Sequence, residues 1–224
     1  MTVRRCGPLL LGPLLLGPLL LGPLLLGMSL VLAVTGGGGA RAAEAPGDAT
    51  RGQVVFAAKQ CVRCHASRGQ PSVGPVVEEL RRPQGAYELA GRFWNHAPAM
   101  FTSLRRDGIA WPELEPAEMA DLMAYLQADA SRDPAPNLAQ GLGLLVRKGC
   151  LKCHRYRGEG GKISEELTQY NPGYQSPVAW AGAVWKHAPR MAEEARRMGV
   201  AYPRFTGEEM GNLVGLLRST AKAP

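Results

Sequence analysis

The stretch Cys61-Val62-Arg63-Cys64-His65 decides the fold of this chain. It returns later in the sequence as Cys150-Leu151-Lys152-Cys153-His154. Each copy holds two cysteines separated by two residues, with a histidine directly after the second cysteine. A single copy is compatible with a covalent prosthetic group, a redox-active dithiol, half of a zinc site or chance. The surroundings of the two copies therefore decide between these alternatives.

The surroundings repeat together with the motif. The stretch Trp94-Asn95-His96-Ala97-Pro98-Ala99-Met100 returns as Trp185-Lys186-His187-Ala188-Pro189-Arg190-Met191. In the same order, Gly108-Ile109-Ala110-Trp111-Pro112 returns as Gly199-Val200-Ala201-Tyr202-Pro203. An internal repeat of this length indicates a duplicated domain and not a short solenoid unit. The duplication favours two sites of c-type haem attachment over a dithiol or a zinc site.

Two haems c would use three side chains of each motif. In each copy, the two thiols form thioethers to one porphyrin, and the histidine is held under the iron as an axial ligand. The thioether residues are Cys61, Cys64, Cys150 and Cys153, and the axial ligands are His65 and His154. A domain of this size buries little apolar surface, so a haem would supply part of its core.

Each repeat resembles a class I cytochrome c domain. The resemblance depends on the haem motif, on a glycine in the helix before it (Gly52 and Gly141) and on a final helix after it. It implies an all-α fold, in which each domain is a small helical bundle around one covalent haem and packs its first helix against its last. The expected boundaries are residues 43–130 for the first tandem domain, 131–137 for a linker and 138–224 for the second domain.

Helical spacing and capping signals place the elements of these domains. The first helix of the first repeat is expected at residues 48–60 and the last at 115–126. Residues 86–106 are expected to be mostly helical, with an interruption at Pro98. In the second repeat, Thr206-Gly207-Glu208-Glu209 is a capping box that opens the final helix. The apolar stripe expected on the helix at 115–126 consists of Met119, Leu122, Met123 and Leu126.

The loop after the motif differs between the two repeats. After the first motif, Gly74-Pro75 resembles the Gly-Pro of the cytochrome c family, whose carbonyl accepts a hydrogen bond from the axial histidine. Such a bond fixes the imidazole and raises its basicity. The second repeat has Arg157-Gly158-Glu159-Gly160-Gly161 after its motif and lacks the Gly-Pro. The sequence therefore does not identify a carbonyl partner for His154.

The sixth iron ligand is the point at which the chain departs from the family. The resemblance places a methionine before a proline there, but the chain has Trp111-Pro112 and Tyr202-Pro203. Thioether ligation gives a higher reduction potential than ligation by two histidines. The expected sixth ligands are Met100 and Met191, with His96 and His187 as the alternative, and the expected propionate contacts are Trp94 and Trp185.

Residues 1–42 are expected to be a signal peptide. They open with Arg4-Arg5, continue with an apolar run and end in Ala40-Arg41-Ala42, which fits a cleavage site before Ala43. From Leu9 to Val34 the apolar run is long enough to span a bilayer, so an uncleaved anchor is the alternative. The resemblance also implies that haem attachment takes place outside the bacterial inner membrane, which favours an exported, periplasmic protein.

The formal net charge of +7 overstates the charge of a mature protein. Three of the 26 basic residues belong to the leader, and without them the net charge falls to +4. The four propionates of two haems would bring this charge close to zero. The charge therefore gives no reason to expect nucleic acid as a partner. Four of the five cysteines lie in the two motifs and Cys6 lies in the leader, which leaves none for a disulfide in the mature chain.

These observations predict a di-haem c-type cytochrome that carries electrons by Fe(II)/Fe(III) cycling. Its expected partners are redox proteins or a membrane respiratory complex, and its contact with the membrane is expected only through a retained leader. The alternative is a di-haem enzyme such as a peroxidase, which needs one open iron position and an acid–base group beside it. The close similarity of the repeats favours the electron carrier, because such enzymes usually differentiate their haems.

Overall fold

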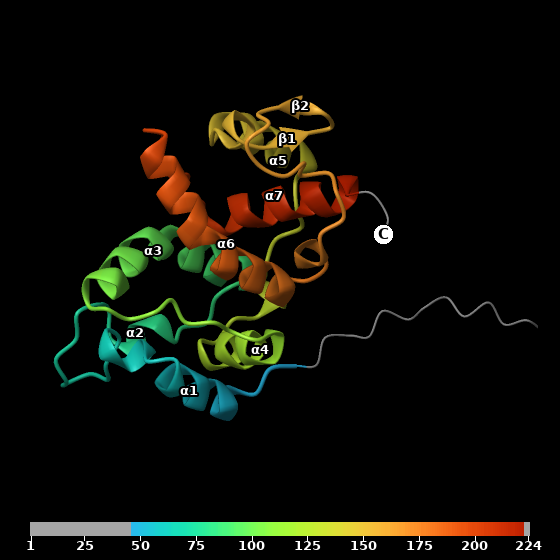
Figure 1. The fold of residues 1–224 in the computed structure, drawn as a ribbon. Coiled ribbons are helices and arrows are strands. Elements are labelled where there is room, and N and C mark those ends of the chain that lie inside the picture. Colours follow the sequence, from blue (N-terminus) through green and yellow to red (C-terminus); the bar gives the residue numbers. More distant parts are fainter. Residues whose placement is uncertain (1–45, 222–224) are drawn as a thin grey trace, which may run out of the picture. The chain divides into compact units, whose positions relative to one another are not determined.

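A computed structural model describes residues 46–221 of the chain (Figure 1). The expected leader at residues 1–42 and its cleavage point lie outside these residues. The described part is mostly helical, as expected. The helices of the first repeat are α1 (Ala49–Ala58), α2 (Val77–Leu80), α3 (Ala86–Arg106) and α4 (Pro116–Tyr125), and those of the second repeat are α5 (Leu138–Arg147), α6 (Pro177–Arg197) and α7 (Gly207–Thr220). No helix in this part of the chain is long and apolar enough to cross a bilayer.

Short elements join the helices. Four turns of 3-10 helix are η1 (Cys61–Arg63), η2 (Ala130–Arg132), η3 (Cys150–Lys152) and η4 (Pro172–Tyr174). The all-α expectation needs one small correction, because β1 (Arg155–Tyr156) and β2 (Glu159–Gly160) form an antiparallel hairpin in the second repeat. The glycines of this segment allow the tight reversal: Gly158 has a φ of +86° and Gly160 a φ of +116°.

In the first repeat, α1 packs against α4 at very short range. Gly52 makes the approach possible, since a Cβ at this position would lie 2.0 Å from the carbonyl oxygen of Asp121. The Asp121 carboxylate fastens the same crossing: it accepts hydrogen bonds from the backbone N–H of Asp48 (2.7 Å) and from the guanidinium of Arg51 (2.8 and 2.9 Å). The close approach implied by the resemblance is confirmed for this pair of helices.

The second repeat builds the same crossing from α5 and α7. A Cβ at Gly141 would lie 2.3 Å from the carbonyl oxygen of Asn212. The Asn212 amide takes the place of Asp121, because its Oδ1 accepts the backbone N–H of Asn137 at 2.6 Å and its Nδ2 donates to Gln140. The two repeats therefore use one geometry with different chemistry, a charged contact in the first and an amide in the second.

The expected interruption of α3 at Pro98 is not found, and α3 runs through this residue without a break. Proline lacks the N–H that would bond to the carbonyl of Trp94, four residues earlier. The hydroxyl of Tyr202 donates to that carbonyl instead, at 3.2 Å. The carbonyl that Pro98 leaves free thus has a partner from the second repeat. Helix α6 likewise continues through Pro189.

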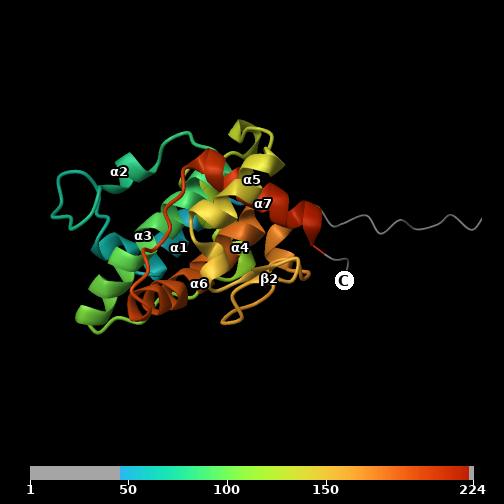
Figure 2. The ribbon, with the colours of Figure 1, turned by 90° about the horizontal axis from the view of Figure 1, so that it is seen from above.

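The two repeats interlock through their long central helices. Helix α3 packs against α6 and also against α7 of the second repeat, while α4 of the first repeat packs against α6. Figures 1 and 2 show α3 and α6 side by side. The expected linker is docked as well, because the Asp133 carboxylate accepts the backbone N–H groups of Ala86 and Tyr87 at the start of α3. The boundaries at residues 130 and 138 stay a prediction.

The apolar stripe predicted on α4 and its extension lies in the core. Its residues expose at most 3% of their surface: Met119, Leu122, Met123 and Leu126. In the second repeat Met210 is 1% exposed, and its sulfur accepts a hydrogen bond from the Trp180 indole at 3.0 Å. These methionines pack the core, as expected.

Candidate functional site

The two cysteine motifs fold into the same local structure. A residue in the left-handed region precedes each motif, Gln60 with a φ of 64° and Gly149 with a φ of 74°. The turns η1 and η3 follow, and in each the backbone N–H of the histidine donates to the carbonyl of the first cysteine at 2.9 Å. The motif therefore turns back on itself, which brings its first cysteine and its histidine close together in the chain.

The first cysteine of each motif is poorly suited to dithiol redox chemistry. Burial raises the pKa of Cys61 to about 11 and the pKa of Cys150 to about 11, whereas a reactive dithiol needs a thiolate with a lowered pKa. All four motif cysteines are free. Among residues 46–221, no three His, Cys, Asp or Glu side chains come together as a metal-ion site.

His65 is held in one orientation by the loop that follows it. Its Nδ1 lies 2.9 Å from the carbonyl oxygen of Pro75. A carbonyl only accepts hydrogen bonds, so Nδ1 carries the proton and Nε2 keeps a lone pair for a metal. Gly74 leaves room for the ring, because a Cβ there would lie 2.7 Å from His65 Cε1. The carbonyl partner implied by Gly74-Pro75 is confirmed.

His154 finds its carbonyl at a residue that sequence reasoning missed. Its Nδ1 lies 3.1 Å from the carbonyl oxygen of Glu165, which fixes the ring in the same tautomer as His65. The Glu165 carboxylate lies 3.8 Å from the same nitrogen and pairs with Arg190 at 3.1 Å. The signal in the sequence was weak, since Glu165 stands where the first repeat has Pro75 and no glycine precedes it.

A second histidine faces each motif histidine from the long central helix. The ring centroids of His65 and His96 lie 5.8 Å apart, and those of His154 and His187 lie 6.1 Å apart. Metal–imidazole bonds of roughly 2 Å on each side, with about 1 Å from each nitrogen to its ring centre, would put two coordinated centroids roughly 6 Å apart. Desolvation lowers the pKa of both His96 and His187, which favours the neutral imidazole that binds metals.

The methionines expected as sixth ligands lie one helical turn beyond these histidines. Met100 and Met191 are both partly buried and pack against the core. Met191 lies in the cavity wall of the second repeat beside His187. The ring contacts that the structure shows across the two sites fall on the alternative pair, His96 and His187.

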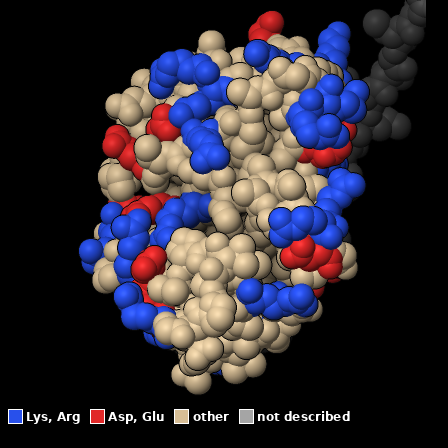
Figure 3. Space-filling view, turned by 90° about the vertical axis from the view of Figure 1, so that its left-hand side faces the viewer, with Lys and Arg blue, Asp and Glu red and all other residues tan. Residues whose placement is uncertain are grey.

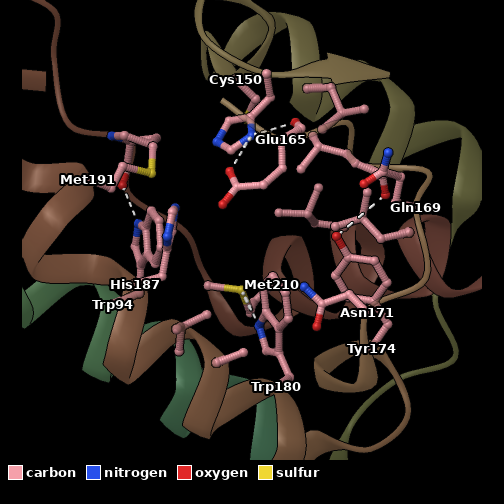
Figure 4. A pocket seen from close by; sticks show the side chains of 18 of the residues that line it. Trp94, Cys150, Glu165, Gln169, Asn171, Tyr174, Trp180, His187, Met191 and Met210 are labelled. Atoms are coloured by element: carbon pink, nitrogen blue, oxygen red, sulfur yellow. Dashed lines mark hydrogen bonds and ion pairs between the residues drawn. The ribbon is translucent and has the colours of Figure 1, made fainter. Parts of the chain in front are cut away.

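Two adjoining cavities surround the motif of the second repeat. Their volumes are about 250 Å³ and about 710 Å³. Their common wall consists of Cys150, His154, Glu165, His187, Met191 and Pro203. In Figure 4, Cys150 and Glu165 lie on one side of the smaller cavity, with Trp94 and His187 on another and Trp180 and Met210 at its floor. A cysteine, two histidines and a largely apolar wall fit a covalently held, apolar prosthetic group.

The indoles expected at propionates have other partners. Trp94 Nε1 donates to the carbonyl of Pro203, and Trp185 Nε1 donates to the carbonyl of Pro112, both at 2.7 Å. An indole has a single N–H, which these bonds use here, and the expected propionate contacts stay a prediction. Each bond joins one repeat to the other. In the described part of the chain, Trp111 Nε1 is a buried indole nitrogen without a hydrogen-bond partner.

Comparison with known proteins adds one finding. Residues 49–128 match the family model of cytochrome c. No match was found among curated proteins. The matched segment contains the first motif, the histidine with its carbonyl partner, and helices α1 to α4. The match supports a c-type cytochrome, a haem-based electron-transfer protein with covalently bound haem c.

Proposed function

We propose that this chain is an exported di-haem c-type cytochrome that transfers electrons, with one covalent haem c in each repeat. One observation supports it most strongly: both repeats place an imidazole across from the histidine of the motif, at centroid distances of 5.8 and 6.1 Å. The second repeat thus carries the same two cysteines, motif histidine and facing histidine as the matched first repeat. When bound, haem c supplies an iron that alternates between Fe(II) and Fe(III).

In each repeat, different side chains would hold different parts of the haem. Cys61 and Cys64 in the first repeat, and Cys150 and Cys153 in the second, are the thioether anchors. The motif histidines would hold the iron through Nε2, because hydrogen bonds to the carbonyls of Pro75 and Glu165 occupy their Nδ1 atoms. Such bonds limit rotation of the ring, so little rearrangement accompanies a change in iron charge. In the second repeat, the apolar part of the cavity wall would limit the access of water to the metal.

We assign the sixth positions to His96 and His187 and not to the methionines. The centroid distances favour the histidines, and Trp111 and Tyr202 occupy the place of the usual methionine ligand. Two imidazoles on each iron give a lower reduction potential than an imidazole and a thioether. The pairing also leaves no iron position open for a substrate, which favours electron transfer over the di-haem peroxidase reading.

Redox proteins or a membrane respiratory complex are the proposed partners. Basic side chains line the larger cavity beside the second motif: Arg147, Lys148, Lys152, Arg190 and Arg197. On the face in Figure 3, Asp and Glu side chains lie among the Lys and Arg side chains. Export is proposed from the leader at residues 1–42, and N-terminal sequencing of the mature protein tests it, with Ala43 as the expected first residue.

The test of the two-haem, two-histidine assignment combines mass spectrometry with spectroscopy of the haem-loaded protein. The wild type is expected to carry two covalent haems, both low-spin when oxidised. His96→Ala and His187→Ala are each expected to turn one haem high-spin while both haems stay attached. Met100→Leu and Met191→Leu are the matched controls, because they change the other candidate on the same helix, and both haems should stay low-spin.

Each other outcome contradicts a distinct part of the proposal. A single haem in the wild type would contradict the di-haem assignment. Loss of the low-spin state in the methionine variants, with none in the histidine variants, would return the sixth positions to Met100 and Met191. A high-spin haem in the wild type would reveal an open iron position, and the di-haem enzyme would then become the better interpretation.

A further inference from the structure

The segment Tyr202–Phe205 of the second repeat is held by α3 of the first repeat. Trp94 Nε1 donates to the carbonyl of Pro203 at 2.7 Å, and the Tyr202 hydroxyl donates back to the carbonyl of Trp94 at 3.2 Å. The Trp94 and Tyr202 rings stack with centroids 5.0 Å apart and planes 21° apart. Asn95 adds two hydrogen bonds to the backbone of Phe205, at 2.7 and 2.9 Å.

The reverse contact also exists. Trp185 of α6 donates its indole N–H to the carbonyl of Pro112 in the first repeat at 2.7 Å. Its ring lies against Trp111, with centroids 4.5 Å apart, and against Phe93 at 5.5 Å. The residue Trp111 corresponds to Tyr202 in the repeat. In each repeat, the segment at the family's usual methionine position is therefore docked by a tryptophan of the other repeat.

Helix geometry lets α3 serve both repeats at once. Two residues along an α-helix correspond to a rotation of about 200°, which puts their side chains on nearly opposite faces. Trp94 and His96 are separated in this way. His96 faces His65 of its own repeat, whereas the Trp94 ring lies 6.4 Å from His187, nearly parallel to it at 25°. Trp94 also lines the smaller cavity of the second repeat, where only 6% of its surface is exposed.

We propose that the two haem sites are completed crosswise: Trp94 is a positioning residue for the haem of the second repeat, and Trp185 for that of the first. This inference rests on the proposed two haems. Trp94 borders His187 directly and fixes Pro203, which forms part of the cavity wall. A change at Trp94 therefore alters the packing and exposure of the second site, although the residue belongs to the first repeat.

The experiment uses the holoprotein with Trp94→Phe and Trp185→Phe, which keep an aromatic ring and remove the indole N–H. Electron paramagnetic resonance and potentiometric titration report each haem separately. A variant with Cys150→Ala and Cys153→Ala keeps only the first haem and so assigns the signals. Trp94→Phe is expected to shift the potential and the resonance of the second haem and leave those of the first unchanged. Trp185→Phe is expected to do the opposite.

Every other pattern overturns the inference. If each tryptophan variant shifts the haem of its own repeat, the indoles act within their repeats; if neither haem shifts, or both shift equally, the tryptophans serve general packing. If Trp94→Phe does not fold, Asn95→Ala tests the same contact and is expected to shift the second haem alone. A wild type with one haem would instead contradict the proposed function, and this inference with it, before any variant is compared.

Discussion

Glu165 places a carboxylate beside the motif histidine of the second repeat, whereas the first repeat has Pro75 at the corresponding carbonyl. Its backbone carbonyl does for His154 what the carbonyl of Pro75 does for His65. Its side chain adds a carboxylate 3.8 Å from His154 Nδ1. A hydrogen bond from Ser164 lowers the pKa of Glu165 to about 2, so the carboxylate is ionised at neutral pH, and Arg190 balances part of its charge. The two proposed haems should therefore differ in potential.

Glu165→Gln is expected to raise the reduction potential of the second haem and to leave that of the first unchanged. A negative charge near the iron favours Fe(III), so removing it favours Fe(II). Because Arg190 balances part of the charge, the interaction between the Glu165 carboxylate and the iron is on the order of 1 kcal/mol. This corresponds to a shift in reduction potential of roughly 40 mV for one electron. Potentiometric titration measures the shift. Glu193→Gln, which breaks an exposed pair with Arg196, is the control, and an equal shift in that variant would contradict the local effect.

At the scale of elements, each repeat depends on a helix crossing that only glycine permits. In the first repeat α1 meets α4 at Gly52, and in the second α5 meets α7 at Gly141. The nearest atoms that a Cβ would meet are backbone atoms of Asp121 and Asn212, which cannot move out of the way as the end of a flexible side chain can. The motif turns η1 and η3 follow directly after α1 and α5, so a displaced first helix moves the cysteines as well.

Gly52→Ala and Gly141→Ala are both expected to destabilise the protein. Overpacking at a close contact costs roughly 1–3 kcal/mol, and a clash with backbone lies at the upper end of that range. Chemical denaturation of the holoprotein measures the loss. Gly182→Ala in α6 is the matched control, because nothing lies within 4 Å of its Cβ position, and alanine there should be neutral or stabilise the helix by about 0.5–1 kcal/mol. Equal stability of all three variants would contradict the requirement for glycine at the two helix crossings.

At the scale of the whole molecule, the two repeats described at residues 46–221 lie within one compact unit. The long helices α3 and α6 are packed together, α3 also covers α7, and Asp133 ties the expected linker to α3. Trp94 and Trp185 each use their only N–H on the opposite repeat. Unfolding one repeat would therefore expose apolar surface and leave buried polar groups of the other without partners.

Both repeats are accordingly expected to unfold in a single transition. Equilibrium denaturation of the holoprotein, followed separately through the spectroscopic signal of each haem, should give coincident midpoints, which is the usual sign of a cooperative unit. Two transitions with different midpoints would show that the repeats are independent. The Trp94→Phe variant provides a comparison, since weakening the cross-repeat contact is expected to separate the midpoints.

Local features of the fold were predictable from the sequence because they depend on near neighbours. The capping box at Thr206 and Glu209, the buried stripe on α4 and the role of Gly52 were all found where expected. The continuity of α3 through Pro98 was not predictable, because the group that satisfies the freed carbonyl of Trp94 is Tyr202, far along the chain. The carbonyl partner of His154 was also not predictable, because no glycine–proline motif marks Glu165 in the sequence.

The sequence by itself determined the chemistry of the chain: two cysteine motifs with their histidines, repeated with two candidate ligands in each half. Repetition cannot choose between candidates that repeat together, nor can it say which repeat a side chain faces. Those choices depend on how helices turn and pack in three dimensions. Only the tertiary structure placed His96 opposite His65. It also showed that Trp94, on the opposite face of the same helix, contacts the second repeat.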